Sequence, residues 1–425
     1  MPKHWQPSRC FDSFVKNTYI SRDRNENCRS GVIQLNELNH FQISLASFAW
    51  KFRRAAMVRG LPPAPFRRAD KVRWLLISEA DQICAAQTYP FFHYSPALRQ
   101  KYGIGVREVL LKQFLKKPPF RNAVDVVCFQ TWFDLKPDQM MRLVDRLHSS
   151  YPDARLVYLD WFAPTDLRYA KLLAPHISFY VKKHLMRDRS YYERTTLGDT
   201  NLTDYYARRF GLSLGPVAND VPKSFLKKVL LGTSFALSAK MLPLFVRPLN
   251  WGERPIDVHA RFATNGTPWY SGMRREFHSR TGDLKGPNVV SGEVVSARQY
   301  HEELLASKIC FSPFGYGEVC WRDFEAAFSG ALLFKPDMSH VESSPNIFEA
   351  YKTYVPIRWD LSDLEEKTHY YLNHPAERKA ITERAFAVVR DHVSENRFVQ
   401  ELQAMFETVA NSAALPNDLI AGEKI

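Results

Sequence analysis

The chain has 425 residues, of which 45% are hydrophobic and 24% are charged. This composition excludes a largely disordered protein, and the length predicts two domains. The formal net charge of +13 favours an anionic partner, either a phosphate-bearing substrate or an anionic membrane surface. Because the sequence has no zinc-finger spacing and no Arg- or Lys-rich low-complexity arm, it argues against nucleic acid as the partner.

The use of cysteine indicates a reducing compartment. The six cysteines form no C-x-x-C pair, and Cys128 and Cys310 lie in apolar runs that are typical of buried strands. The first residues also lack the apolar segment of a secretory signal. We therefore expect a cytoplasmic protein, and a peripheral contact with the inner face of a membrane stays open.

The first domain is expected to begin near residue 73. Residues 1–72 show no clear periodicity and are rich in Arg, Asn and Pro, so we expect an irregular N-terminal extension. Continuous apolar runs then alternate with helical patterns, which predicts a parallel sheet that helices cover on both faces. Residues 73–225 are therefore predicted to form a Rossmann-like domain. Its expected strands are 74–80, 123–132, 154–161 and 176–185, and its expected helices are 95–117, 137–152 and 165–175.

Residues 226–253 are expected to join two domains. Within them, VLLGTSFALSAKMLPLFV (229–246) is long and mostly apolar, but Gly232, Lys240 and Pro243 interrupt it. A membrane-spanning helix needs about 20 predominantly apolar residues. We therefore interpret the segment as a buried connection between domains.

A second alternation of strands and helices begins at residue 254, which predicts a second Rossmann-like domain over 254–393. Residues 394–425 are expected to form a C-terminal helix and tail that could pack back on the first domain. The predicted fold class is α/β, with two Rossmann-like domains that face each other across a cleft. The expected strands of the second domain are 254–263, 308–314, 331–336 and 353–359, with a short one inside 287–295.

The stretch FSPFGYGEVCWRDFEAAFSGALLFKP (311–336) places a glycine-rich loop between an expected strand and an expected helix. Gly315 and Gly317 would let the backbone of the loop approach an anion, which the positive end of the helix attracts. Arg322 in the first helical turn can contact phosphate through two hydrogen bonds. Glu325, about one turn later, can accept hydrogen bonds from ribose or sugar hydroxyls.

These features favour a site for a nucleotide sugar. Glu318 would contact the hexose and is a candidate catalytic residue, and Ser312 and Tyr316 would complete the donor contacts. The alternative is a tight turn followed by ordinary surface ion pairs. The sequence contains neither G-x-G-x-x-G nor G-K-[ST] at this place, which argues against a dinucleotide site or a P-loop.

The segment 307–337 resembles the donor-binding core of two-domain glycosyltransferases of the GT-B type, in the group with exostosin-like and group 1 C-terminal domains. The resemblance covers residues 254–411 well and 73–185 only by architecture. It implies GT-B architecture and transfer of a sugar from a nucleoside diphosphate sugar donor to a glycan, a lipid-linked or a protein acceptor, without a metal or other cofactor. The residues that match the pattern are Ser307, Lys308, Ser312, Pro313, Gly315, Arg322, Glu325, Ala326 and Gly330.

The resemblance also suggests roles for residues outside the loop. A basic residue at the position of Arg261, or of Arg274 on the next expected helix, neutralises the departing diphosphate in similar enzymes, and the matched Glu325 contacts ribose. Retaining members of the class carry two glutamates eight positions apart, whereas Glu318 and Glu325 are seven apart. The stereochemical outcome therefore stays open.

Acceptor-side residues are expected in the first domain. Asp160 ends a predicted strand, so it is our candidate for the general base that takes the proton of the acceptor hydroxyl. His93 and Lys182 are candidates for the lining of the acceptor site, although packing beside aromatic residues would also explain them. A non-catalytic glycan- or partner-binding protein on the same scaffold is the alternative function.

Overall fold

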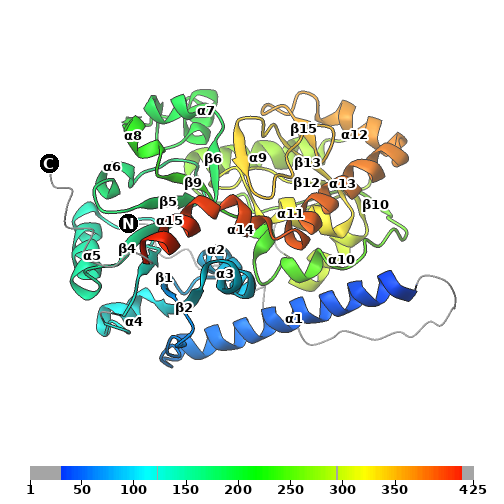
Figure 1. Ribbon diagram of the computed structural model, residues 1–425. Helices are drawn as coiled ribbons and strands as arrows, with labels where there is room; N and C mark the ends of the chain where they lie inside the picture. Colours follow the sequence, from blue (N-terminus) through cyan, green and yellow to red (C-terminus); the bar gives the residue numbers. More distant parts are fainter. Residues whose placement is uncertain (1–29, 122, 293–294, 414–425) are drawn as a thin grey trace.

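The structure is a computed structural model that describes residues 30–121, 123–292 and 295–413. Two sheets, each flanked by helices, lie side by side in the molecule (Figure 1). The strands of both sheets run parallel to their neighbours. The predicted fold class, an α/β protein with two Rossmann-like units, is confirmed.

The N-terminal unit contains a six-stranded sheet in the order β2-β1-β3-β4-β5-β9. Most side chains of its central strands are buried, as expected for a parallel sheet covered on both faces. The strands are β1 (Val72–Ser78), β2 (Ile104–Leu110), β3 (Val126–Phe129), β4 (Arg155–Asp160), β5 (Phe179–Lys182) and β9 (Val229–Leu231). The helices include α2 (Gln82–His93), α3 (Ser95–Tyr102), α4 (Leu111–Lys116), α5 (Pro137–Ser150), α6 (Ala170–Leu173), α7 (Asn201–Phe210) and α8 (Lys223–Leu226).

Strand β2 corrects the prediction of one helix over 95–117. Gly103 ends α3 in the left-handed conformation with a φ of 70°, which stops the helix. The next residues pair with β1 along their whole length. Gly105 fits there because a Cβ atom at this position would lie 2.1 Å from Cγ of Asp70. The predicted helix 165–175 is likewise wrong in extent, because only α6 is helical there.

Helix α1 (Ser30–Val58) lies where an irregular extension was expected. Its buried residues Ser47, Trp50, Arg54 and Met57 recur at helical spacing, but exposed apolar residues lie between them. With apolar side chains on two faces, the sequence shows no single amphipathic period, which explains why the helix was missed. Residues 1–29 of the expected extension lie outside the described residues.

The apolar stretch 229–246 does not form a long helix. Its first residues are β9, the edge strand of the N-terminal sheet, and two short turns follow, η2 (Phe235–Leu237) and η3 (Leu242–Leu244). Within the described ranges, the structure contains no helix that is both long and apolar enough to cross a membrane.

The C-terminal unit contains a five-stranded sheet in the order β11-β10-β12-β13-β15. Its strands are β10 (Ile256–Arg261), β11 (Val289–Gly292), β12 (Ser307–Phe311), β13 (Leu332–Pro336) and β15 (Val355–Ile357). Its helices are α9 (Pro268–Gly282), α10 (Ala297–Leu305), α11 (Trp321–Ser329), α12 (Leu364–Asn373) and α13 (Pro375–Ser394). The loops that follow β12, β13 and β15 all leave the sheet at its carboxyl edge, where ligands bind in such folds.

The two units are joined by more than the chain connection. The short strand β6 (His184–Met186) of the N-terminal unit pairs antiparallel with β14 (Val341–Ser343) of the C-terminal unit. Arg189 forms an ion pair of 2.6 Å with Glu342 beside this ladder. The expected strand 176–185 is therefore divided into two strands. β5 lies inside the N-terminal sheet, and β6 pairs with the C-terminal unit.

The last helices cross back over the N-terminal unit, where they are drawn in red in Figure 1. Helices α14 (Arg397–Glu401) and α15 (Gln403–Ala413) follow a break at Asn396, which has a φ of 53°. The ring of Phe398 stacks on Tyr94 with centroids 5.2 Å apart, and Phe406 packs on Trp74 at 5.6 Å. The C-terminal segment thus completes the apolar core of the first unit.

This packing predicts that Phe406→Ala lowers the stability of the N-terminal unit. Phe406 is fully buried, so its removal leaves a cavity and should cost about 3–5 kcal/mol. Urea unfolding followed by circular dichroism measures the effect as a lower midpoint. The control is Phe48→Ala on the exposed side of α1, which should change the stability by less than about 0.5 kcal/mol. Equal midpoints for the two variants would contradict the packing role of Phe406.

Candidate active site

The glycine-rich loop that follows β12 is tied to the start of α11 by one buried aspartate. Asp323 accepts hydrogen bonds from Oγ of Ser312 at 2.6 Å and from the backbone N–H of Cys320 at 2.8 Å. Its carboxylate also forms an ion pair of 2.9 Å with Nζ of Lys335 on β13. Ser312, a predicted donor contact, therefore has a structural partner that fixes the loop on the helix.

Gly317 lies directly against the N-terminal unit. A Cβ atom built on it would lie 1.6 Å from the carbonyl oxygen of Ala163, so only glycine fits. Gly315 closes the turn by donating its N–H to the carbonyl of Gly317 at 2.9 Å. The sequence predicted that these glycines make room for a diphosphate, and that remains a prediction. The contact between the units is a second reason for a glycine at 317.

On one side of the loop, two arginines lie around the ring of Phe262. The guanidinium carbons of Arg274 and Arg322 are 5.4 Å and 5.9 Å from its centroid. Arg274 also covers the ring of Tyr270 at 4.8 Å, and Tyr270 stacks on Tyr316 of the loop at 4.4 Å. Tyr316 is 39% exposed and accepts a hydrogen bond from the N–H of Thr267. Arg322, Tyr316 and the loop are thus brought together.

Neither arginine has a carboxylate within ion-pair distance in the part of the chain that the structure describes. Arg274 donates to the carbonyl of Ala263 at 3.4 Å, and Arg322 donates to that of Arg261 at 2.7 Å. The Nε atom of each is buried and has no hydrogen-bond partner among the described residues. Burial lowers the pKa of Arg274, as expected for a cation that lacks an anion. Burial also lowers the pKa of Arg322, but nearby groups, Tyr300 foremost and Glu325 among them, raise it above its usual value.

On the other side of the loop, Glu318 is fully buried between the two units. Its Oε1 atom accepts a hydrogen bond from Thr165 at 3.3 Å, and the nearest atoms of His184 and His340 are 3.6 Å and 3.8 Å from the carboxylate. Burial raises the pKa of Glu318, but the two nearby histidines outweigh this effect and hold the pKa well below its usual range. Glu318 is therefore a buried carboxylate that stays ionised.

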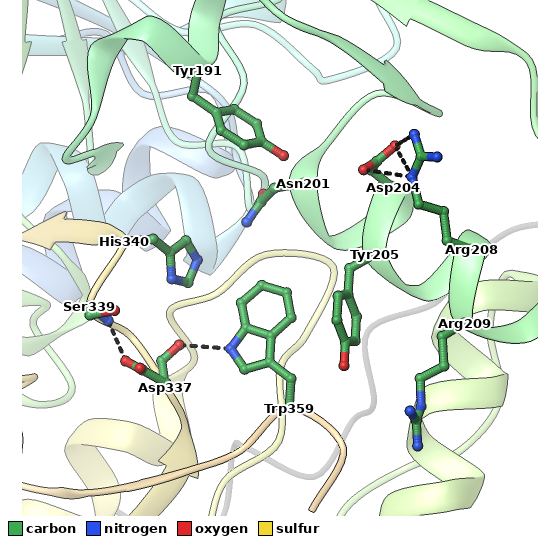
Figure 2. A pocket seen from close by; sticks show the side chains of 10 residues that line it. All are labelled: Tyr191, Asn201, Asp204, Tyr205, Arg208, Arg209, Asp337, Ser339, His340 and Trp359. Carbon is green, nitrogen blue, oxygen red and sulfur yellow. Dashed lines mark hydrogen bonds and ion pairs between the residues drawn. The ribbon is translucent and has the colours of Figure 1, made fainter.

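A cavity of about 860 Å³ opens next to this cluster (Figure 2). It lies where the carboxyl ends of β13 and β15 face α7 of the N-terminal unit, as expected for a ligand site in this architecture. His340 lines it, as does Asn201, whose Oδ1 atom accepts a hydrogen bond from Thr165. The lining residues are Tyr191, Asn201, Asp204, Tyr205, Arg208 and Arg209 from the N-terminal unit and Asp337, Ser339, His340 and Trp359 from the C-terminal unit.

The cavity combines aromatic rings with polar groups. Trp359 and Tyr205 lie edge to face at 4.8 Å, and Figure 2 shows them next to each other below Asn201 and His340. Arg208 is held by Asp204, and the indole N–H of Trp359 donates to the carbonyl of Asp337 at 3.0 Å. Such mixed walls suit a sugar, which has both apolar faces and hydroxyl groups.

None of the residues that line the cavity is among the site residues predicted from the sequence. Trp359 could have been found, because it ends a predicted strand and the carboxyl ends of parallel strands form the ligand site. The helix α7 gave no comparable signal. It lies in a stretch between the predicted sheet and the linker for which no element was proposed.

Arg261 and Glu325 lie close to Arg322 but have protein partners. Arg261 forms hydrogen bonds of 2.5 Å and 2.9 Å with Glu303 on α10. Glu325 accepts hydrogen bonds from Lys240 at 3.1 Å and from the hydroxyl of Tyr300 at 3.0 Å. Burial raises the pKa of Glu325, but the charge of Lys240 and other cations brings it below its usual value. Their predicted diphosphate and ribose contacts would need these pairs to rearrange.

Asp160, Lys182 and His93 lie away from the cavity. Asp160 and Lys182 form an ion pair of 2.9 Å with both side chains fully buried, and the hydroxyl of Tyr180 also donates to Asp160. His93 packs on the ring of Tyr94 at 4.7 Å, beneath the C-terminal helices. None of the three is among the residues that line the cavity. Their catalytic and acceptor-side roles remain predictions.

His184, which lies beside Glu318, predicts that the protein loses stability as the pH falls. Burial lowers the pKa of His184 from 6.5 to about 4, so the unfolded chain takes up this proton first as the pH falls. The stability that neutral His184 provides above pH 6.5 should be lost progressively between pH 6.5 and 4. His184→Gln should show a shallower loss over this range in urea unfolding. The same slope as the wild type would contradict the assignment, and His369→Gln is the exposed control.

One part of the chain is similar to a known protein family. Residues 243–404 match the family model described as glycosyl transferase-like. No curated protein matches the sequence. Among solved structures, an alpha-glucosyltransferase in complex with UDP-glucose and DNA containing an abasic site aligns with 7% identity, over 79% of this chain and 98% of its own, with a TM-score of 0.46. A glycosyltransferase from Rickettsia africae aligns with 10% identity over 80% and 99% of the chains, with a TM-score of 0.42.

The family match begins in the connection between the units and contains the whole sheet of the C-terminal unit together with its glycine-rich loop. It confirms the resemblance that the segment 307–337 carries. Residues 243–404 are therefore similar to the family described as glycosyl transferase-like, and the chain folds into two Rossmann-like units.

Proposed function

We propose that the protein is a glycosyltransferase that moves a sugar from a nucleoside diphosphate sugar to an acceptor hydroxyl. One observation carries the proposal: Arg274 and Arg322 converge on Phe262 without a carboxylate partner in the described residues. A buried cation is costly unless an anion accompanies it. A diphosphate between the two guanidinium groups would supply that anion.

The position of these arginines supports a diphosphate over other anions. Arg322 belongs to the first turn of α11, whose N-terminus adds about half a positive charge and free N–H groups. Arg274 comes from α9, so two helices contribute to one site. The charge that develops on the departing nucleoside diphosphate would be stabilised by fixed cations, and we therefore propose that no metal ion is required.

The cavity between the units would hold the sugars. His340 lines it, and the carboxylate of the buried Glu318 lies 3.8 Å behind the ring of His340. A histidine that a carboxylate orients and stabilises can take a proton from an acceptor hydroxyl. We propose this cluster for that task ahead of Asp160, whose carboxylate is occupied by Lys182 and Tyr180. The acceptor class stays as proposed from the resemblance: a glycan, a lipid-linked sugar or a protein.

The donor proposal predicts opposite effects of one substitution on stability and binding. Arg274→Met should leave the ligand-free protein as stable as the wild type or more stable, because an unpaired buried charge is removed. The same variant should bind the donor about ten- to a hundredfold more weakly, from the loss of charge-assisted hydrogen bonds. A thermal-shift screen with UDP-, GDP-, dTDP- and CMP-sugars, followed by calorimetry, measures both effects.

The control for this experiment is Arg254→Met. Arg254 is also largely buried, but it donates hydrogen bonds to the carbonyls of Ser307 and Ser329. This variant should lose stability and keep the donor-induced shift. If Arg274→Met binds every donor as the wild type does, the arginine pair is not the diphosphate site.

The catalytic proposal predicts that Glu318→Gln retains donor binding but loses turnover. The amide keeps the shape of the side chain but removes the negative charge beside His340, so the transfer rate should fall by about 10²–10⁴-fold. Release of nucleoside diphosphate in the presence of acceptor measures the rate, and the thermal shift measures binding. A wild-type protein that binds a donor but never turns it over would favour the non-catalytic alternative.

A further inference from the structure

Helix α1 is fixed to the N-terminal unit by one face only. Trp50 packs on the ring of Tyr89 with centroids 5.0 Å apart, and Arg54 forms a buried ion pair of 2.6 Å with Glu108 on β2. The hydroxyl of Ser47 donates to the carbonyl of Ala239 in the connection between the units. These residues recur every three or four positions, so they define one side of the helix.

The opposite side of α1 carries a continuous apolar stripe, which consists of Phe41, Leu45, Phe48 and Phe52. Their side chains are 64%, 55%, 60% and 70% exposed. Their spacing of four, three and four residues places them in one row, and at 100° per residue this row points away from the buried face. Figure 1 shows α1 along the outer edge of the molecule, where such a row can meet a partner.

The stripe is unusual for a helix that faces water. Residues 41–50 contain no charged side chain at all. Scattered exposed apolar residues need no explanation, but a row of three phenylalanines and a leucine on one helix marks an interaction surface. Since α1 is held rigidly on its other side, the stripe is a permanent feature of the surface.

Charge indicates which partner fits the stripe. From residue 41 to residue 69 the sequence has no Asp or Glu, whereas it has six basic residues. Arg54 is neutralised by Glu108, and the others are exposed. An apolar row bordered by exposed cations is the pattern of helices that lie in the surface of an anionic bilayer. The basic residues are Lys51, Arg53, Arg54, Arg59, Arg67 and Arg68.

A second copy of the chain fits the stripe less well than a bilayer. Pairing two α1 helices would bring their basic flanks together, and each chain carries a formal net charge of +13. An acidic lipid surface presents the opposite charge. Insertion across the membrane is not required, since α1 does not meet the length and apolarity of a spanning helix in the described residues.

We propose that α1 docks the protein on an anionic lipid bilayer, with Phe41, Leu45, Phe48 and Phe52 inserted among the headgroups and the neighbouring Lys and Arg side chains on the acidic lipids. The proposal depends on the surface of α1 alone. It stands or falls separately from the transferase reaction.

The test is sedimentation of the full chain with lipid vesicles. The protein should bind vesicles made of equal parts phosphatidylcholine and phosphatidylglycerol, bind pure phosphatidylcholine at least about tenfold more weakly, and lose binding as salt is added. The double variant F48S/F52S should bind the mixed vesicles at least about tenfold more weakly than the wild type, because its two exposed rings can no longer enter the lipid.

Phe133→Ser is the matched control, since Phe133 is 47% exposed but lies outside α1, and it should bind as the wild type does. Circular dichroism should show that F48S/F52S remains folded, because these side chains are exposed. Wild-type protein that stays in the supernatant, or a double variant that binds normally, would overturn the proposal. A wild-type dimer that F48S/F52S converts to a monomer in light scattering, without vesicle binding, would overturn it in favour of a second copy.

Discussion

The close approach of Gly317 to the carbonyl of Ala163 is the constraint on which the rest of the site depends. It brings the loop after β12 against the N-terminal unit and buries Glu318 beside His184. The pairing of β6 with β14 fixes the same boundary a few residues away. Because both contacts join the units, the cavity that they share keeps its shape, and residues from distant parts of the sequence meet in it. The site therefore belongs to neither unit alone.

The charged groups around the loop divide into two kinds. Asp323 with Lys335, and Asp160 with Lys182, are buried pairs in which each charge has a partner. Such pairs orient the backbone and leave no charge for a ligand. Arg274 and Arg322 are the other kind, held by carbonyl groups without a carboxylate within ion-pair distance among the described residues. This difference separates structural charges from those suited to an anionic substrate.

The sequence was a good guide to the strands and to the loop. Long apolar runs bounded by turn residues predicted β1, β3, β4, β10, β12 and β13, because a strand buried on both faces needs no other signal. The same rule misjudged β2, where Gly103 ends a helix in the middle of a helical pattern. Helix α1 was not predicted, because apolar residues lie on two of its faces and its sequence therefore lacks a single amphipathic pattern.

The site was predictable only in part, because its residues come together through tertiary contacts. Spacing along one helix indicated Arg322 and Glu325, and the loop indicated Glu318. Arg274 could be named from its helix, but the lack of a partner that singles it out is visible only in three dimensions. Asp160 ended a strand as expected of a base, yet Lys182 on the neighbouring strand lies directly opposite in the register. The lining from α7 depends on the packing of the two units.

The return of α14 and α15 to the first unit decides what could be cut from this protein. A fragment limited to residues 243–404, the family match, would lose the partner strand of β14 and expose Phe398 to water. Phe406 lies beyond this fragment. An N-terminal fragment without the C-terminal helices would lack Phe406 too, and so would lose part of its core. Chimaeras that exchange one unit for that of a related enzyme would create the same open strand edge and apolar surface. Neither unit is therefore expected to fold without the other, although the sequence pattern predicts two separate domains.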